Sequence, residues 1–284
     1  MPHAQPSATI VIPAHNEVSG LGRLLPLLLG SAAPGEFRVI VVCNGCSDGS
    51  AAEARRHGSD VEVVELAQPS KAAALAAGGA LVRAYPVAFV DADVALDTES
   101  VRGLVALLGR PGLLAAAPTR RLERGRVSRP AGWYYDIWER LPGVRAGLFG
   151  RGVIVLSEAG FRRVSALPQF VSDDLAFSES FQPGERGISE DSVVSVWPAR
   201  TWRSLVLRRV RVVQGNRELH EAGRVSESAS TSVGDLLGIV RAEPRMATRL
   251  PVFLVTTILS RLLERRMRGS RTSTWMRDET SRAT

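Results

Sequence analysis

Short apolar runs alternate with segments of helical spacing over the first hundred residues of the chain. The apolar runs are rich in β-branched residues, as strands are, and cover residues 8–13, 37–43, 61–66 and 87–90. The helical segments between them cover residues 19–30, 50–57 and 70–84. Pro26 lies inside the first of these and is expected to kink or shorten it. Because buried strands that alternate with helices form parallel sheets, the pattern predicts a parallel sheet with helices on both faces.

Beyond residue 117 the alternation gives way to longer polar and aromatic segments. We expect an Arg-rich loop, an aromatic helix and a Gly-rich stretch at residues 119–129, 133–141 and 143–152. We then expect a strand at residues 153–156, a helix from residue 158 and an acidic segment at 172–179. A second strand is expected at 193–197 and a basic helix at 201–219. The Ser/Thr-rich residues 226–232 are the best linker candidate, and two helices are expected after them.

Net charge changes this picture mainly near the C-terminal end. The chain of 284 residues is 45% apolar, which is typical of a globular α/β domain with an appendage. Of the formal charge of +7, residues 241–284 contribute +6, from ten Arg and four acids. Such a basic segment favours an anionic surface as partner. A nucleic acid is not expected, because the segment has no interleaved aromatic residues beyond Trp275.

The cysteines and the apolar runs bear on the compartment. Cys43 and Cys46 are the only two cysteines, so no disulfide framework is implied and a cytoplasmic protein is expected. A redox or zinc motif is disfavoured, because the βα series is too long for a thioredoxin-like unit and no second C-x-x-C pair follows. Residues 1–10 lack a signal-peptide pattern, and no apolar run reaches the roughly 18–20 residues that span a bilayer.

Polar segments follow all four predicted strands of the first hundred residues. Ligands of open parallel sheets bind beyond the carboxyl ends of the strands. The four segments are Ala14-His15-Asn16-Glu17, residues 43–50, Gln68-Pro69-Ser70-Lys71 and Asp91-Ala92-Asp93. Together they offer hydrogen-bonding groups, one cation and a pair of carboxylates, which predicts a single ligand site at this edge of the sheet.

Asp91 and Asp93 carry the most specific signal. Residues i and i+2 that leave a strand project similarly, so both carboxylates can share one site. Two like charges held close are costly unless a cation lies between them. Oxygen ligands suit Mg²⁺ or Mn²⁺ that arrives with a phosphate substrate. A solvated turn is the alternative explanation.

Other residues at the strand ends have structural alternatives. Asp48 or Ser50 either caps the next helix or belongs to a loop that binds a base and a ribose. Lys71 is the only lysine among 36 basic residues and opens a predicted helix. A phosphate bound there would be held by the lysine side chain and by the N-terminus of the helix. The alternative is a surface lysine without a ligand. Gly20-Leu21-Gly22 half-matches a dinucleotide fingerprint but lacks its third glycine, so we discount it.

Taken as a set, residues 10–17, residues 41–50, Lys71 and Asp91-Ala92-Asp93 resemble glycosyltransferase family 2. The resemblance covers about the first 100 residues, with weaker similarity to about residue 220. It implies a GT-A fold: an α/β, Rossmann-like, mostly parallel sheet flanked by helices, here with a helical C-terminal extension. We expect a catalytic domain at 1–220, with a nucleotide-sugar-binding half (1–117) and an acceptor-binding half (118–220), and a helical basic tail at 231–284.

The resemblance also implies inverting transfer from a nucleoside diphosphate sugar with Mg²⁺ or Mn²⁺. Six residues match positions that contact the donor nucleotide: Pro13, His15, Glu17, Asn44, Asp48 and Lys71. Asn44 stands where the family usually has an Asp that binds the base, and Cys43 also replaces an acid. Asp91 and Asp93 match the motif that binds metal and diphosphate, with Asp93 as the more direct ligand.

Two further segments of the resemblance concern catalysis. Ser172-Asp173-Asp174-Leu175 is similar to an acidic pair whose second member is the catalytic base, so Asp174 is assigned this role with Asp173 second. A base is needed because an acceptor hydroxyl is a poor nucleophile. The alternative is that Asp173 caps a helix. Arg211 lies in a basic segment similar to one that closes over the diphosphate, and a solvated basic helix is the competing explanation.

Acceptor and location are less specified. The acceptor would be a glycan, a lipid-linked molecule or a small molecule of cell-envelope, glycolipid or secondary-metabolite synthesis. It is expected to bind residues 119–181. There Trp133, Tyr134, Tyr135 and Trp138 either contact it or belong to the core. Residues 250–267 are apolar and then Arg-rich, which fits peripheral attachment to an anionic membrane, packing on the catalytic domain, or a dimer.

Two other functions compete with an active glycosyltransferase. The first is a catalytically degenerate relative that binds a nucleotide sugar or a membrane, motivated by Cys43 and Asn44 in place of acids. The second is a nucleotidyltransferase on a similar sheet. That chemistry usually needs a Gly-rich, basic loop after the first strand, which Ala14-His15-Asn16-Glu17 is not.

Overall fold

The computed structural model describes residues 6–167, 173–223 and 231–267. The chain divides into two compact units. The first comprises Met1–Arg121, Leu148–Gln169 and Ser180–Val196, and the second Leu122–Gly147, Phe170–Glu179 and Trp197–Thr284. These limits do not coincide with the predicted domain boundaries, because segments beyond residue 147 return to complete the first unit. The linker candidate falls largely on residues 224–230, which lie outside the described residues.

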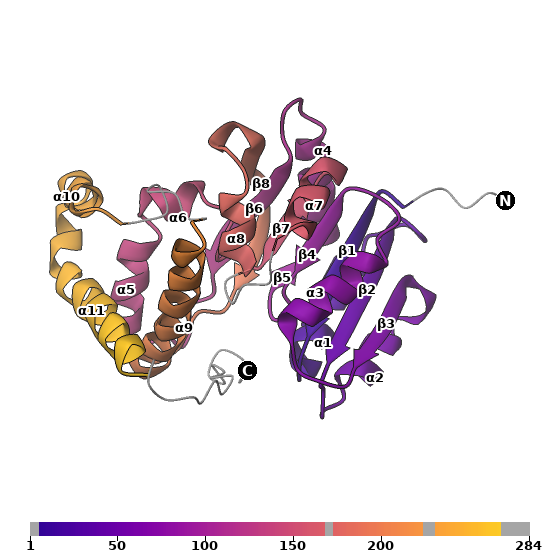
Figure 1. Cartoon of the computed structure of the whole chain (residues 1–284), viewed down its shortest axis with the longest axis horizontal. Helices are drawn as coiled ribbons and strands as arrows, with labels where there is room; N and C mark the ends of the chain where they lie inside the picture. The colour runs from indigo at the N-terminus through magenta and orange to yellow at the C-terminus, as the bar shows by residue number, and fades with distance from the viewer. Residues whose placement is uncertain (1–5, 168–172, 224–230, 268–284) are drawn as a thin grey trace. The chain divides into compact units, whose positions relative to one another are not determined.

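An α/β sheet with covering helices makes up the first unit (Figure 1). Its elements are β1 (Ala8–Ala14), α1 (Val18–Leu29), β2 (Phe37–Asn44), α2 (Ser50–Arg55), β3 (Val61–Leu66), α3 (Lys71–Ala80), β4 (Val87–Val90), β5 (Ala95–Leu96), α4 (Thr98–Leu108), β6 (Ala115–Leu122), β7 (Val153–Leu156), α7 (Glu158–Ser165) and β8 (Arg186–Val196). The four strands predicted in the first hundred residues are all present. Pro26 does not shorten α1, which continues to Leu29, because buried leucines on both sides of the exposed proline anchor the helix to the sheet. A kink at Pro26, the other expected effect, stays a prediction.

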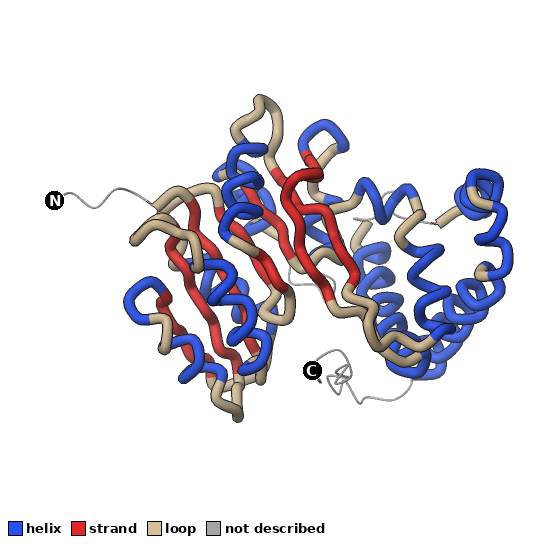
Figure 2. The backbone as a smooth tube through the Cα atoms, turned by 180° about the vertical axis from the view of Figure 1, so that it is seen from behind, coloured by secondary structure: helices blue, strands red, loops and turns tan. Residues whose placement is uncertain are grey.

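Among the described residues, eight strands form one sheet in the order β3-β2-β1-β4-β7-β6-β8-β5. Figure 2 shows the strands side by side in red. β1 pairs in parallel with β2 and β4, and β2 pairs in parallel with β3. β7 runs antiparallel to both β4 and β6, and β5 runs antiparallel to β8. The sheet is therefore mixed, and its parallel half is the half predicted from the alternating pattern. Part of the predicted loop at 119–129 is strand instead, since β6 extends to Leu122.

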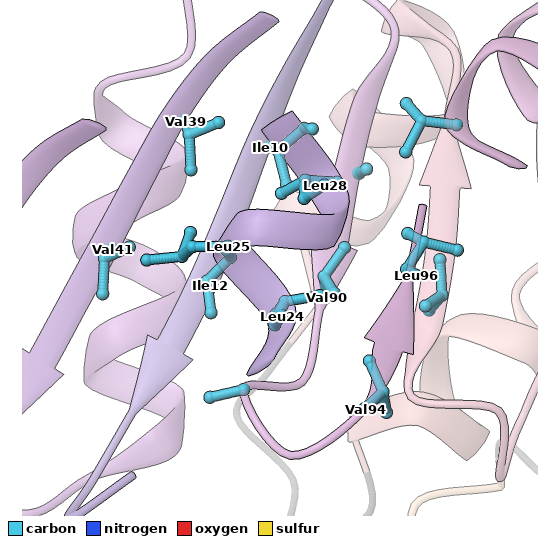
Figure 3. Packing of buried hydrophobic residues seen from close by; sticks show 14 of the residues in the cluster. Ile10, Ile12, Leu24, Leu25, Leu28, Val39, Val41, Val90, Val94 and Leu96 are labelled. Carbon is cyan, nitrogen blue, oxygen red and sulfur yellow. The ribbon is translucent and has the colours of Figure 1, made fainter. Parts of the chain in front are cut away.

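Helices cover both faces of the parallel half. Ile10 and Ile12 of β1 point toward α1, whose Leu24, Leu25 and Leu28 fill the same buried cluster (Figure 3). Val11 faces the other way. There α3 comes so close that a Cβ at Gly78 would lie 2.4 Å from Val11 Cγ1. The predicted two-sided covering is thus present, and it fixes the strand ends that carry the candidate site.

The second unit is helical. Its helices are α5 (Arg129–Trp138), α6 (Pro142–Ala146), α8 (Asp173–Glu179), α9 (Trp202–Glu221), α10 (Val233–Ala242) and α11 (Leu250–Met267). α11 packs against α5 and α9 (Figure 1). Tyr134 of α5 stacks on Phe253 of α11 with ring centroids 5.0 Å apart, and Trp202 Nε1 donates to Thr256 Oγ1 at 2.8 Å. Residues 250–267 are expected to attach to a membrane, to pack on the catalytic domain or to form a dimer. Packing within the protein accounts for one side of α11.

The aromatic segment belongs largely to the core of this unit. Tyr134 and Tyr135 are buried, and the Tyr135 hydroxyl accepts a hydrogen bond from the Ala199 N–H at 3.1 Å. Trp133 is exposed, and its contact with an acceptor stays a prediction. Within the described part of the chain, no helix is both long and apolar enough to cross a membrane.

Candidate functional site

The carboxyl ends of β1, β2 and β4 lie at one edge of the sheet because these strands are parallel. Buried Asn44, at the end of β2, ties the loops there together. Its Nδ2 donates to the Ala14 carbonyl at 2.7 Å, and its Oδ1 accepts from the Ser70 N–H at 3.0 Å. The His15 Nδ1 donates in turn to the Asn44 carbonyl, which orients the imidazole. Asn44 therefore has a structural task, and its contact with a base stays a prediction.

Asp48 links the starts of two helices. Its carboxylate accepts from the Val18 N–H at 3.3 Å and from the Ser50 N–H at 3.0 Å. The Ser50 hydroxyl donates to Asp48 and accepts from the N–H of buried Glu17 at 2.7 Å. Pro13 is buried within β1. The N-cap residue of α2 is nevertheless Gly49, without a side-chain cap, so neither Asp48 nor Ser50 caps this helix as predicted. The loop that Asp48 shapes stands beside the ends of β1 and β2.

Lys71 and Asp91 meet at this edge of the sheet. The Lys71 Nζ lies 2.8 Å from Asp91 Oδ1. Lys71 is the first residue of α3, and the helix is capped by Ser70, whose side chain accepts from the Ala73 N–H at 3.1 Å. The only lysine of the chain and the first acid of the predicted metal motif, 20 residues apart, are therefore direct neighbours.

The turn Asp91-Ala92-Asp93 is held from two sides. The Asp91 N–H donates to the Gly152 carbonyl at 2.7 Å, and the Asp93 carbonyl accepts from Arg23 Nη2 at 3.1 Å. Gly152 has a φ of +69°, and a Cβ there would lie 2.6 Å from Val94 Cγ1. Sequence reasoning missed both Arg23 and Gly152. The only signal was the Gly-rich stretch before β7, which carried no assigned role.

Cys43 behaves as a small apolar residue. It is buried in the core cluster, and burial together with the neighbouring Cys46 raises the pKa of its thiol to about 12. At neutral pH the thiol stays protonated, which makes it a poor nucleophile. This agrees with disfavouring a redox motif, and it leaves no acid where the family usually has one.

The remaining predicted residues belong to the second unit. Asp173 and Asp174 stand in the first turn of α8, and both are partly buried. Asp174 Oδ1 accepts from the Leu175 N–H at 2.8 Å. Ser172, which precedes them, lies outside the described residues. Arg211 is exposed on α9.

The sequence pattern of the family described as Glycosyl transferase family 2 matches residues 9–163, more than half of the 284 residues. The chain belongs to glycosyltransferase family 2. An uncharacterized glycosyltransferase of Mycobacterium tuberculosis H37Rv is 36% identical over 104 residues, 37% of this chain and 44% of the relative. A 4,4'-diaponeurosporenoate glycosyltransferase of Staphylococcus aureus RF122 is 36% identical over 130 residues, 42% of this chain and 34% of the relative. The chain thus spans less than half the length of these curated relatives.

Solved structures support the fold of this family 2 protein. A mannosyltransferase from Pyrobaculum calidifontis, in complex with GDP-Man and Mn²⁺, matches with a TM-score of 0.62 at 19% identity, over 95% of this chain and 77% of that one. Glucosyl-3-phosphoglycerate synthase from M. tuberculosis, in complex with phosphoglyceric acid, matches with a TM-score of 0.55 at 19% identity, over 78% and 81%. The predicted family and GT-A fold are confirmed, and with them the assignment to the transferases.

The donor atoms at the strand ends fit a divalent cation that arrives with a diphosphate. Among the described residues, no group of three or more His, Cys, Asp or Glu side chains could hold a metal by itself. Mg²⁺ is commonly bound by one or two carboxylates and completes its shell with substrate phosphates and water. Asp91 and Asp93 of this glycosyltransferase supply that number of hard oxygen ligands at one turn, so the residues present match the implied ion.

Proposed function

We propose that this family 2 protein transfers a sugar from a nucleoside diphosphate sugar to an acceptor hydroxyl with inversion, assisted by Mg²⁺ or Mn²⁺. The observation that carries the proposal is the Lys71–Asp91 pair, 2.8 Å apart, beside Asp93 at the strand ends where His15 and Asn44 also lie. One ammonium and two carboxylates suit a diphosphate and its cation. The Lys71 ammonium would turn to the anionic diphosphate, and the two carboxylates would hold the ion.

The chemistry assigns different tasks to the two units. In the first, Lys71 would offset the negative charge that builds on the departing diphosphate, and a cation held by Asp91 and Asp93 would supply further charge stabilisation. In the second, Asp174 takes the proton of the acceptor hydroxyl as it attacks the anomeric carbon, with Asp173 as the second acid. Arg211 is proposed to contact phosphate. The acceptor is a glycan, a lipid-linked or a small molecule of cell-envelope, glycolipid or secondary-metabolite synthesis. The names of two similar proteins, glucosyl-3-phosphoglycerate synthase and 4,4'-diaponeurosporenoate glycosyltransferase, illustrate how diverse the acceptors are.

A panel of UDP, GDP, CDP, dTDP and their common sugar conjugates, with Mn²⁺ or with EDTA, tests the proposal. We expect at least one nucleoside diphosphate to raise the melting temperature by about 5 °C at roughly 100 times its Kd, and only with the metal. Its sugar conjugate should release nucleoside diphosphate in a metal-dependent way. No stabilisation by any of these ligands, or equal stabilisation in EDTA, would contradict the proposal.

A second function, binding of a nucleotide sugar without catalysis, is favoured by the two residues that stand where the family usually has acids. Cys43 is buried with a raised pKa, and both side-chain polar atoms of Asn44 are engaged within the protein. The same panel separates the two functions. Metal-dependent stabilisation without release of nucleoside diphosphate, in the presence of glycan and lipid acceptors, is the result expected of a binding protein.

We also propose that the exposed side of α11 attaches the protein to an anionic membrane. Phe253, Thr256 and Ser260 on one side of the helix are buried, whereas four apolar side chains are 42–55% exposed: Leu254, Val255, Ile258 and Leu262. The same helix carries exposed arginines at 261, 265 and 266. The apolar side chains can insert at the boundary between headgroups and acyl chains, while the neighbouring arginines bind anionic headgroups.

Sedimentation with vesicles tests this membrane surface. The parent protein is expected to pellet with phosphatidylglycerol vesicles at low salt and to be released at high salt, because the attraction of the arginines is screened. The double variant Ile258→Glu with Leu262→Glu should stay in the supernatant. Leu27→Glu, the same change at an exposed position of α1, should pellet like the parent. Equal recovery with and without vesicles would reject the surface, and a dimer that the double variant dissociates would assign it to a second copy of the chain.

A further inference from the structure

Arg23 reaches from α1 to the turn that bears the two acids. Its Nη2 donates to the Asp93 carbonyl at 3.1 Å. The guanidinium is partly buried, and burial lowers the pKa of Arg23 although the nearby charges of Asp93 and Glu17 raise it. An arginine stays protonated at neutral pH despite such a shift. A fixed positive charge therefore lies near two carboxylates, that of Glu17 at the start of α1 and that of Asp93 in the turn after β4.

The surface of α1 is shaped for this turn. Gly20 lies one helical turn before Arg23 on the same face. A Cβ at Gly20 would lie 2.4 Å from the Ala92 carbonyl oxygen and 3.2 Å from Glu17 Oε2. Any larger residue would push α1 away from the acidic turn and lengthen the Arg23–Asp93 contact. Gly20, the first glycine of the half-matched dinucleotide fingerprint, thus has a different task, which is close packing against the acidic turn.

We propose that Arg23 is a positioning residue for the divalent cation, acting through the Asp93 backbone and carboxylate. The inference rests on the proposed function, because it presumes that Asp93 binds the ion. Arg23 holds the turn at the Asp93 carbonyl, and Gly152 holds it at the Asp91 N–H. Because both ends of the turn are held, the Asp91 and Asp93 carboxylates keep their separation when no ion is bound. Binding of the ion then requires little further ordering of these two side chains. Residues that orient metal ligands in this way commonly change metal affinity by about 10–100-fold when they are removed.

Direct measurement of Mn²⁺ binding tests this role without relying on turnover. Mn²⁺ is titrated into the full chain by water-proton relaxation, with saturating UDP, or with GDP if only the guanine nucleotide binds. Arg23→Met is expected to raise the Kd for Mn²⁺ by about tenfold or more, and Arg23→Lys, which keeps the charge but not the fork of donors, by less. The melting temperatures of parent and variants in EDTA should be similar, which a general loosening of the fold would not allow.

Arg38→Met is the matched control. Arg38 pairs with Glu62 at 2.8 Å and lies on β2 in the same unit. It should change the Kd for Mn²⁺ by less than twofold. If Arg23→Met and Arg23→Lys both bind Mn²⁺ like the parent while Asp93→Asn does not, the positioning role is wrong and the metal site stands. If Asp93→Asn also binds Mn²⁺ like the parent, the metal site itself is wrong and the inference falls with it.

Discussion

Asp174→Asn is expected to lower the turnover number by about 10²–10⁴-fold, the usual contribution of a general base. The amide cannot accept the acceptor's proton, but its Oδ1 can still accept from the Leu175 N–H as the carboxylate does at 2.8 Å. The start of α8 should therefore be retained and the melting temperature little changed. Release of nucleoside diphosphate in the presence of acceptor measures the effect, and the metal-dependent thermal shift with nucleotide should equal that of the parent.

Asp173→Asn is the control for this prediction, because it makes the same isosteric change in the same helical turn. A smaller loss is expected, since Asp173 is the second acid of the pair. If Asp173→Asn loses activity and Asp174→Asn keeps it, the two roles are exchanged. If both variants turn over like the parent, the acids of α8 have no part in the chemistry.

Asp93→Asn is expected to remove metal-dependent binding of the donor and to lower kcat/KM by about 10³-fold, since the cation supplies several kcal/mol of charge stabilisation. An amide is a weaker ligand for a hard cation than a carboxylate. The Asp93 carbonyl remains, so the contact from Arg23 at 3.1 Å is preserved. Thermal shift with nucleotide and Mn²⁺, and initial rates over a range of Mn²⁺, measure the loss.

Asp60→Asn controls for the loss of one negative charge. Asp60 is exposed before β3 and should leave both measurements unchanged. Asp91→Asn should weaken donor binding as well, but it also takes the charged partner from Lys71. Wild-type metal dependence in Asp93→Asn would overturn the proposed metal site, whatever Asp91→Asn does.

The half of the fold predicted best is the half with local signals. Residues 61–66 and 87–90 form β3 and β4 as predicted, because an apolar β-branched run bounded by turn residues has few other stable conformations. The direction of the later strands carries no such signal. β7 is as apolar as β4, yet it runs antiparallel to it. Its direction depends on the path of the chain through the second unit, which hydrophobic periodicity does not encode.

The candidate site likewise has features that follow from the local sequence and contacts that only the tertiary structure makes. The sequence by itself determined that polar segments follow four strands and that Asp91, Asp93 and Lys71 are chemically unusual among them, because residue type and distance from a strand end are local properties. Only the tertiary structure decided that Lys71 contacts Asp91, that Gly152 and Arg23 hold the acidic turn, and that Asn44 ties the loops together. Arg23 and Asp93 are 70 residues apart. A contact over such a distance exists only after the chain has closed a long loop, so no pattern within a few residues of either partner reports it.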